Sequence, residues 1–165
     1  MKKIFALLAV FTAVNSFAQP GKPQSPHDTV STSNVTVTYG RPYKKGRDVF
    51  GGLEKFGVVW RLGANEATTI TFNKDVKFGG EGVHAGTYTM FALLNENEWT
   101  IILNGQLGQW GAFDYEKYKD KDVAKVTVPV IKLDNVVEQL TIRFDKNNSM
   151  IIEWDKTQVV VPLSF

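Results

Sequence analysis

Two-residue alternation of apolar and polar side chains is the dominant pattern of this chain from Asn34 to its C-terminus. Such alternation is typical of β-strands, and no long stretch has the 3.6-residue period of a helix. Aromatic residues make up 12% of the chain, as expected for pleated surfaces. The pattern predicts an all-β domain over residues 34–165, a single antiparallel β-sandwich of jelly-roll type with about nine or ten short strands.

Turn signals separate the expected strands. Asn73-Lys74-Asp75 and the glycine-rich stretch 79–82 predict turns on either side of a short strand. Pro129 cannot donate a ladder hydrogen bond, so it indicates an edge strand or a bulge. Residues 113–119 could form one exposed helical turn. Strands are expected at residues 35–39, 69–72, 76–78, 88–94, 99–103, 123–133, 136–144, 150–154 and 159–163.

Residues 1–18 have the three parts of a secretory signal peptide. A basic start is followed by a nearly all-apolar core at 4–14 and by small residues in Ser16-Phe17-Ala18, and the core is too short to span a membrane. We therefore expect cleavage near Ala18 and a periplasmic or secreted protein with no membrane span. Residues 19–33 contain three prolines and are expected to form a flexible leader.

The charge and cysteine content exclude several classes of function. Removing Lys2 and Lys3 with the signal peptide reduces the 19 basic residues to 17, which equals the 17 acidic residues. A neutral chain has no overall field that attracts nucleic acid, so we expect none as a partner. The chain has no cysteine, which excludes disulfides, a lipid anchor on cysteine and thiolate chemistry.

The chain has only two histidines, which limits its catalytic and metal chemistry. A serine triad needs an imidazole base, but His27 lies in the expected leader and His84 in a hairpin arm. Two histidines cannot build a multi-histidine zinc site, and no phosphate loop or dinucleotide fingerprint occurs. Lysines alternate with the acidic residues of 114–122, which predicts a solvated loop instead of a calcium site. We expect no metal and no cofactor.

Glu138 is the one charged residue that falls on an apolar strand face. In the expected strand 136–144 it alternates in phase with Leu140 and Ile142. A buried carboxylate must be paired or hydrogen-bonded, or its pKa must rise. We therefore predict that Glu138 is buried, with an arginine as its partner.

Three arginines, Arg41, Arg47 and Arg61, lie in glycine-rich segments. The planar guanidinium pairs with carboxylates in a bidentate way, so these residues could bind neighbouring acids or a ligand. In one interpretation Arg61 pairs with Glu66 or Glu138 while Asn65 caps a tight turn. In the other, one or two arginines stay open to an anionic or hydroxyl-rich ligand.

The tryptophans divide into two groups. Trp60 and Trp154 alternate with apolar neighbours and are predicted to lie in the core. Trp110 sits in Gly108-Gln109-Trp110-Gly111, where small neighbours leave the ring accessible. Exposed aromatic rings of this kind stack on sugars or pack against partners, and Trp110 could equally cover one end of the sandwich.

Several of these stretches together carry a family resemblance. They are VTVTYGRPYKKGRDVFGG, WRLGANEATTITF, AGTYTMF, the WG at Trp110, and the later EQLTI and EW. With them the chain from about Ser25 to Phe165 resembles an exported bacterial family catalogued as domain of unknown function 2911. That family has no assigned activity. The resemblance implies an envelope-facing β-rich module, with residues 60–66 as its most specific stretch.

Three hypotheses follow from the sequence. The first is an exported module that binds a glycan or another envelope component through Arg41, Arg47, Arg61, Asn65, Glu66 and Trp110. The second is a carboxylate-dependent hydrolase with Glu66 or Glu138 as acid or base, since a pair of carboxyl groups suffices for glycoside chemistry. The third is a structural or interaction module. The oligomeric state is left open.

Overall fold

The computed structural model describes residues 24–165. The expected signal peptide and residues 19–23 of the expected leader lie outside this range. The described chain is mostly β, its sheets are antiparallel, and the expected all-β architecture is confirmed with twelve strands. The strands are β1 His27–Ser31, β2 Val35–Gly40, β3 Val59–Trp60, β4 Thr69–Phe72, β5 Val76–Phe78, β6 Glu81–Val83, β7 Gly86–Leu94, β8 Glu98–Asn104, β9 Asp122–Pro129, β10 Ile131–Phe144, β11 Met150–Val161 and β12 Leu163–Ser164, with helix α1 Tyr115–Tyr118 and a 3-10 turn Lys119–Lys121.

A seven-stranded sheet forms the main layer. Its strand order is β1-β2-β4-β7-β8-β9, and β3 pairs with β7 beside β4. The sheet ends at β9, whose last residue is Pro129. The expected edge position of Pro129 is confirmed, because an edge strand does not need the N–H that proline lacks.

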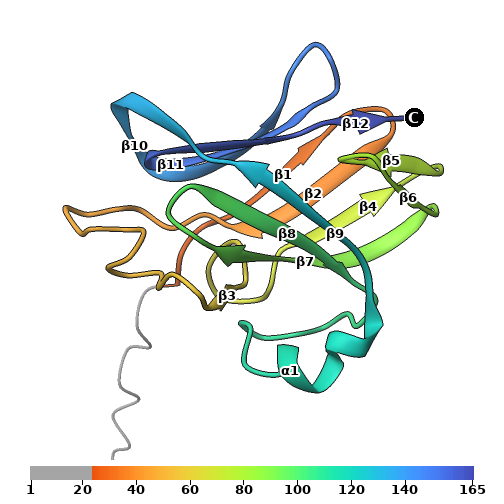
Figure 1. Cartoon of the computed structure of the whole chain (residues 1–165), viewed down its shortest axis with the longest axis horizontal. Coiled ribbons are helices and arrows are strands. Elements are labelled where there is room, and N and C mark those ends of the chain that lie inside the picture. The colour runs from red at the N-terminus through yellow and green to blue at the C-terminus, as the bar shows by residue number, and fades with distance from the viewer. Residues whose placement is uncertain (1–23) are drawn as a thin grey trace, which may run out of the picture.

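The β10–β11 ribbon and the small sheet β12-β5-β6 lie over one face of the main sheet (Figure 1). Buried side chains of both layers form one core. Trp60 of the main sheet and Trp154 of the ribbon are 3% and 0% exposed, and their rings stack 6.1 Å apart. The predicted core positions of both tryptophans are confirmed. The backbone N–H of Ile142 also donates to the Tyr39 hydroxyl across the layers at 3.0 Å.

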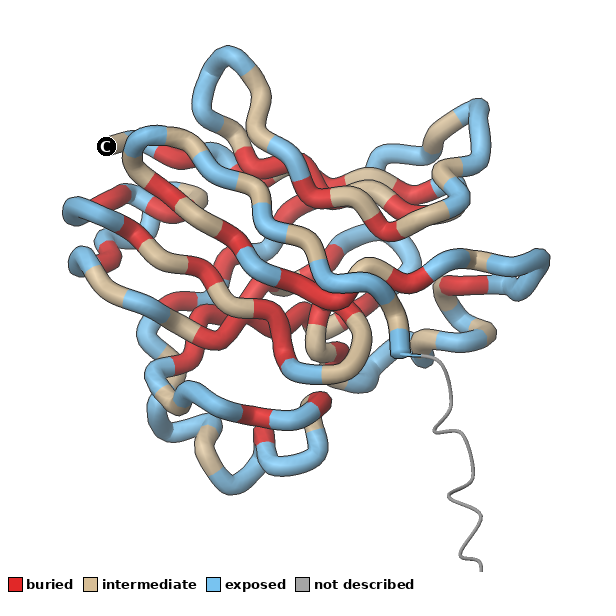
Figure 2. Tube along the Cα trace, turned by 180° about the vertical axis from the view of Figure 1, so that it is seen from behind, coloured by how far each residue is buried: buried red, intermediate tan, exposed pale blue. Residues whose placement is uncertain are grey.

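The opposite face of the main sheet carries a smaller apolar cluster. Buried and exposed residues alternate along many strands (Figure 2), but neighbours in β7 and β8 are buried on both faces. Phe91 packs there against Tyr115 of α1, with ring centroids 5.2 Å apart. The Tyr115 hydroxyl donates to Asp122 at 2.7 Å, and burial raises the pKa of that phenol. No helix within residues 24–165 is long and apolar enough to cross a membrane.

The structure corrects two expected boundaries. Residues 27–31 were assigned to the leader but form β1, which pairs with β2 from His27↔Gly40 to Ser31↔Thr36. The chain leaves the main sheet at Val130, so residues 131–144 form a single strand instead of parts of two. The sequence pattern did not predict these two boundaries, because the exposed parts of β1 and β10 carry mostly polar side chains and show no apolar alternation.

Glu138 is exposed, so its predicted burial is wrong. The register of β10 against β11 shifts twice between Lys132 and Thr141. These irregularities interrupt the alternation before Leu140, where it resumes with a fully buried side chain. The Glu138 carboxylate accepts a hydrogen bond from the backbone N–H of Lys45 at 2.8 Å, and no arginine forms an ion pair with it among the described residues.

Candidate functional site

The stretch that follows Trp60 is a loop inserted between two strands on the same side of β7. Trp60 pairs with Ala92 of β7, and Thr69 pairs with Thr89, so β3 and β4 run alongside β7 in the same direction. Residues 61–68 leave the sheet between these two points; we call them the insert loop. Pairing with β7 therefore fixes the positions of both ends of the insert loop.

Thr68 closes the base of the insert loop. Its backbone N–H donates to the Arg61 carbonyl at 3.1 Å, and its buried hydroxyl donates to the Leu62 carbonyl at 2.8 Å. Leu62 and Asn65 both have left-handed backbone conformations, with φ of 53° and 65°. Leu62 is fully buried, so packing holds a conformation that a bulky residue rarely adopts.

Gly63 is required in this loop by close packing, not by a positive φ. A side chain at position 63 would place its Cβ 2.9 Å from the Thr68 hydroxyl and 3.0 Å from the Gly40 carbonyl. The backbone N–H of Ala64 donates to that same Gly40 carbonyl at 3.2 Å. The insert loop is therefore pressed directly against the end of β2.

A second, longer loop of residues 41–58 connects β2 to β3 and faces the insert loop (orange to yellow in Figure 1). Val49 is 1% exposed, and Phe50 packs on Trp99 with centroids 4.8 Å apart, so both anchor this loop to the core. Glu54 is held by two backbone hydrogen bonds of 2.8 Å, to Val49 and from Gly51. Loops longer than about 12–15 residues within compact domains usually have a function.

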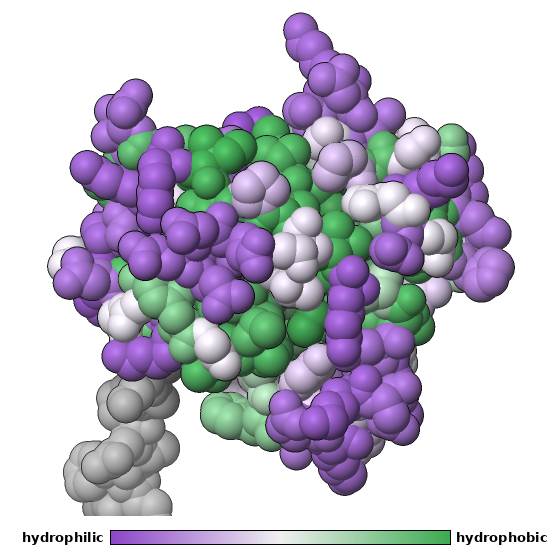
Figure 3. Space-filling view, viewed as in Figure 1, coloured by the Kyte–Doolittle hydropathy of each residue, from purple (hydrophilic) through white to green (hydrophobic). Residues whose placement is uncertain are grey.

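A cleft of about 200 Å³ lies between these two loops. It contains two arginines, one carboxylate and one amide. Its walls are Ser25, Pro42, Arg47, Leu53, Glu54, Arg61, Gly63, Ala64, Asn65 and Trp154. Hydrophilic side chains gather at the same end of the face drawn in Figure 3, around the bend of the β10–β11 ribbon.

Glu54 is the partly buried carboxylate of this cleft. Burial raises the pKa of Glu54 above its ordinary value, and the nearby Arg61 and Arg47 guanidiniums oppose this rise without cancelling it. Glu54 forms no ion pair with any of the described residues. A carboxylate with two guanidiniums nearby but no ion pair can bind a ligand hydroxyl or amine.

Arg47 is oriented by the turn that precedes it. Lys45 and Gly46 have positive φ values of 49° and 70°, which reverse the chain. The Arg47 Nε then donates to the Lys44 carbonyl at 2.9 Å, and Nη2 donates to the Tyr43 carbonyl at 2.5 Å. Nη1 has no acceptor among the described residues, so the guanidinium is fixed in place while one of its nitrogens remains available.

Arg61 and Asn65 form the opposite wall. Arg61 Nη1 donates to the Asn65 carbonyl at 2.9 Å, and the guanidinium lies 5.8 Å from the centroid of the Phe113 ring. The Asn65 amide donates to the Ser25 carbonyl at 3.1 Å, which ties the segment before β1 to the insert loop. These contacts leave Nε and Nη2 of Arg61 without acceptors among the described residues.

Three other residues named from the sequence lie outside the cleft. Arg41 donates to the Leu140 carbonyl and the Thr141 hydroxyl, and it also pairs with Asp28 at 3.4 Å, so its side chain links β1 to β10. The other two are Glu66 and Trp110, which form an isolated β-bridge.

Glu66 and Trp110 define a neighbouring surface at the far side of the insert loop. The Glu66 carboxylate lies 3.2 Å from His27, and both side chains are about half exposed. Trp110 is 51% exposed, so the predicted accessibility of its ring is confirmed. Phe113 is 79% exposed and lies beside Arg61. Arg61 thus lines the cleft and also borders the neighbouring surface through its contact with Phe113.

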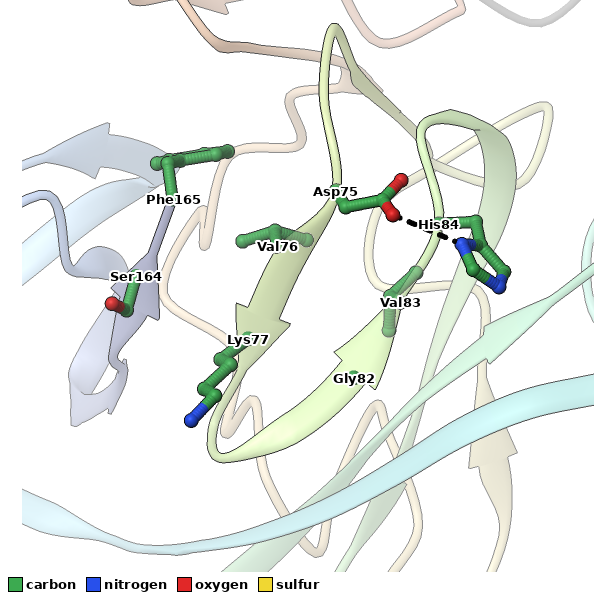
Figure 4. A pocket seen from close by; sticks show the side chains of 8 residues that line it. All are labelled: Asp75, Val76, Lys77, Gly82, Val83, His84, Ser164 and Phe165. Carbon is green, nitrogen blue, oxygen red and sulfur yellow. Dashed lines mark hydrogen bonds and ion pairs between the residues drawn. The ribbon is translucent and has the colours of Figure 1, made fainter.

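A larger hollow of about 580 Å³ lies at the small sheet, where β5, β6 and the end of the chain meet (Figure 4). His84 Nδ1 lies 3.1 Å from the Asp75 carboxylate, and their side chains are 92% and 70% exposed. The hydrogen bond from the backbone N–H of Ala85 lowers the pKa of Asp75 most, and the hydrogen bond with the His84 side chain lowers it further. Ser164 stands on the opposite side of β5 from this pair in Figure 4, so the three residues do not form a triad.

Sequence reasoning missed Glu54 because nothing local distinguishes it. It lies in a glycine-rich loop beside Lys55, where an acidic residue is expected to be solvated. The available signals were indirect: the length of the loop, and the presence of Arg47 in the same segment. Its partial burial depends on contacts with the insert loop and the core.

The fold and the two loops define a β-rich domain with a small polar cleft between the loops. A family model described as "Protein of unknown function (DUF2911)" matches residues 22–163, and the chain belongs to this family. Comparisons with curated proteins and with solved structures found no match.

Proposed function

We propose that the protein is an exported module that binds a glycan, or another anionic or hydroxyl-rich envelope component, in the cleft between the two loops. The observation that carries this proposal is Glu54, a partly buried carboxylate near Arg47 and Arg61 with no ion pair to a described residue. Burying charged groups without direct pairing costs stability. A ligand that satisfies both the guanidiniums and the carboxylate would account for such an arrangement.

The rigidity of the cleft supports binding. The Arg47 guanidinium is fixed by two backbone carbonyls, and Arg61 is fixed by the Asn65 carbonyl. Side chains that are already ordered lose little entropy when a ligand arrives. Guanidiniums also recognise carboxylates through paired N–H groups.

The carboxylate-dependent hydrolase is less well supported. Glycoside hydrolysis uses two carboxyl groups that face each other across the substrate. Glu54 is the only carboxylate among the described residues that line the cleft. Glu66 pairs with His27, and Glu138 binds the Lys45 backbone. The geometry therefore favours binding over hydrolysis.

A glycan array probed with the mature protein tests this proposal. We expect binding to acidic glycans, and a loss of at least about tenfold for Arg61→Gln, because one guanidinium–carboxylate interaction contributes about 1.5 to 3 kcal/mol. Arg143→Gln is the matched control, since it removes an exposed arginine that pairs with Glu153 away from the cleft. A wild-type protein that binds no glycan would refute the glycan as its ligand, and an Arg61→Gln variant that binds equally well would refute the cleft as the binding site.

Export is the second part of the proposal. It is supported by the signal-peptide pattern of residues 1–18, which lie outside the described range. N-terminal sequencing of protein released from the periplasm or medium should find Gln19 as the first residue. An intact Met1 in that fraction would contradict it.

A further inference from the structure

We infer that the cleft is the terminal compartment of a longer groove, and that its ligand is an acidic oligosaccharide chain bound by one end. This inference rests on the proposed function. A second hollow of about 410 Å³ adjoins the cleft, and the two share Ser25, Pro42 and Arg47 as walls. Gln24, Pro26, Tyr43 and Lys45 complete this outer hollow.

The size of the inner cleft sets what it can hold. Its volume of about 200 Å³ equals that of about seven water molecules in the liquid, enough for one small cyclic residue but not for a chain. The outer hollow has about twice this volume. A chain whose terminal residue fills the cleft can continue along the larger outer hollow, past Arg47.

The chemistry changes between the two compartments. The inner cleft has two guanidiniums, from Arg47 and Arg61, which suit the carboxylate of an acidic terminal residue, and Glu54 suits its hydroxyls. The outer hollow has the Tyr43 ring, which is 41% exposed, and the Lys45 ammonium. An aromatic face beside a cation is suited to a sugar ring that carries a charge.

The backbone of the outer hollow favours a sugar chain over a peptide. Peptides bound in extended form add hydrogen bonds to free backbone groups. Here the Tyr43 and Lys44 carbonyls accept from Arg47, while the Lys44 and Lys45 N–H groups donate to the carbonyl and the carboxylate of Glu138. The side chains that remain recognise hydroxyls and carboxylates.

Calorimetry with uronic acid ligands of increasing length tests this inference. The probes are glucuronate, an oligosaccharide of four uronic acid residues, a neutral oligosaccharide of equal length, and an acidic tetrapeptide. We expect the uronic acid oligosaccharide to bind at least about tenfold more tightly than glucuronate, and both to bind more tightly than the neutral chain. Tyr43→Ala should remove most of the gain from chain length and leave glucuronate binding within about twofold, because Tyr43 lines only the outer hollow.

Tyr118→Ala is the control for loss of an aromatic ring, since Tyr118 lies on α1 and lines neither compartment. Thermal melts of both variants confirm folding. Glucuronate binding without a gain from chain length, or a gain that survives Tyr43→Ala, refutes the groove and leaves the proposed cleft intact. Tighter binding of the acidic peptide than of the oligosaccharide refutes the choice of a sugar chain. If no acidic sugar binds, the inference fails, and an acidic glycan is also refuted as the ligand of the proposed function.

Discussion

Gly40 and Ala64 lie in direct backbone contact, although they belong to separate stretches of the sequence. A Cβ atom at position 40 would overlap the Ala64 carbonyl, and the Ala64 N–H donates to the Gly40 carbonyl at 3.2 Å. The contact joins the end of β2 to the insert loop, and these elements position Pro42 and Asn65 in the cleft. It places the stretch VTVTYGRPYKKGRDVFGG, which contains Gly40, beside the stretch WRLGANEATTITF, which contains Ala64.

Gly40→Ala should therefore destabilise the protein by about 3 kcal/mol or more, because the overlap is with backbone that cannot move aside cheaply. Gly82→Ala is a suitable control, since nothing lies within 4 Å of a Cβ built there and its φ is not in the left-handed region. Urea unfolding curves of the two variants provide the comparison. Equal midpoints would show that the contact is looser than described.

Asn65 tests whether the insert loop is held by conformation or by side-chain contacts. Asn65→Ala should cost about 1 to 2 kcal/mol, because alanine tolerates the left-handed φ of 65° less well and the hydrogen bond to Ser25 is lost. Asn65→Gly loses the same hydrogen bond but accepts the backbone conformation, so it should cost less. Thermal melts should rank glycine above alanine, and equal losses in the two variants would assign the effect to the amide instead of the backbone conformation.

The raised pKa of Glu54 predicts that the stability of the folded protein depends on pH. Its pKa is raised in the folded state, so the folded protein binds a proton more readily than the unfolded chain, and the ionised carboxylate lowers stability as pH rises. Glu54→Gln should therefore raise the melting temperature at pH 7. The gain should shrink as the pH falls toward and below 4.5, the ordinary carboxyl value, where both states are protonated. A Gln variant that is less stable at pH 7 would mean that the arginines prevail over desolvation.

Glu138 and Leu140 test the irregular register of β10. Glu138→Ala should cost no more than about 1 kcal/mol, because the carboxylate is exposed and water can replace it at the Lys45 N–H. Leu140→Ala should cost about 2 to 5 kcal/mol, since Leu140 is 0% exposed. Denaturant unfolding separates the two. A larger cost at Glu138 would mean that Glu138 is buried, as strict alternation along the strand predicts.

The strand pattern was accessible from sequence wherever one face of a strand is buried. Trp60 and Trp154 alternate with their neighbours, and both lie in the core as predicted. Trp110, between glycines, is exposed as predicted. The edge strand β1 was not recognised, because its residues are exposed or only partly buried and so carry little apolar signal.

The candidate site was only partly accessible from sequence. Arg47, Arg61 and Asn65 were selected from their residue types and glycine-rich surroundings, and the structure brings them to one cleft. Arg41 was selected on the same grounds but is bonded to β10 instead. Local sequence does not distinguish these cases, since the difference lies in what each guanidinium meets across the fold.

The sequence by itself determined the class of fold, because the two-residue period of a strand is a local property that each segment carries on its own. The tertiary structure alone decided which carboxylate is buried. Alternation pointed to Glu138, but a shifted register turned it outward, while Glu54 became partly buried in a loop without any period. Burial of a loop residue depends on segments far apart in the chain that come together only after the sheet has formed, as β2 and the insert loop do at Gly40 and Ala64.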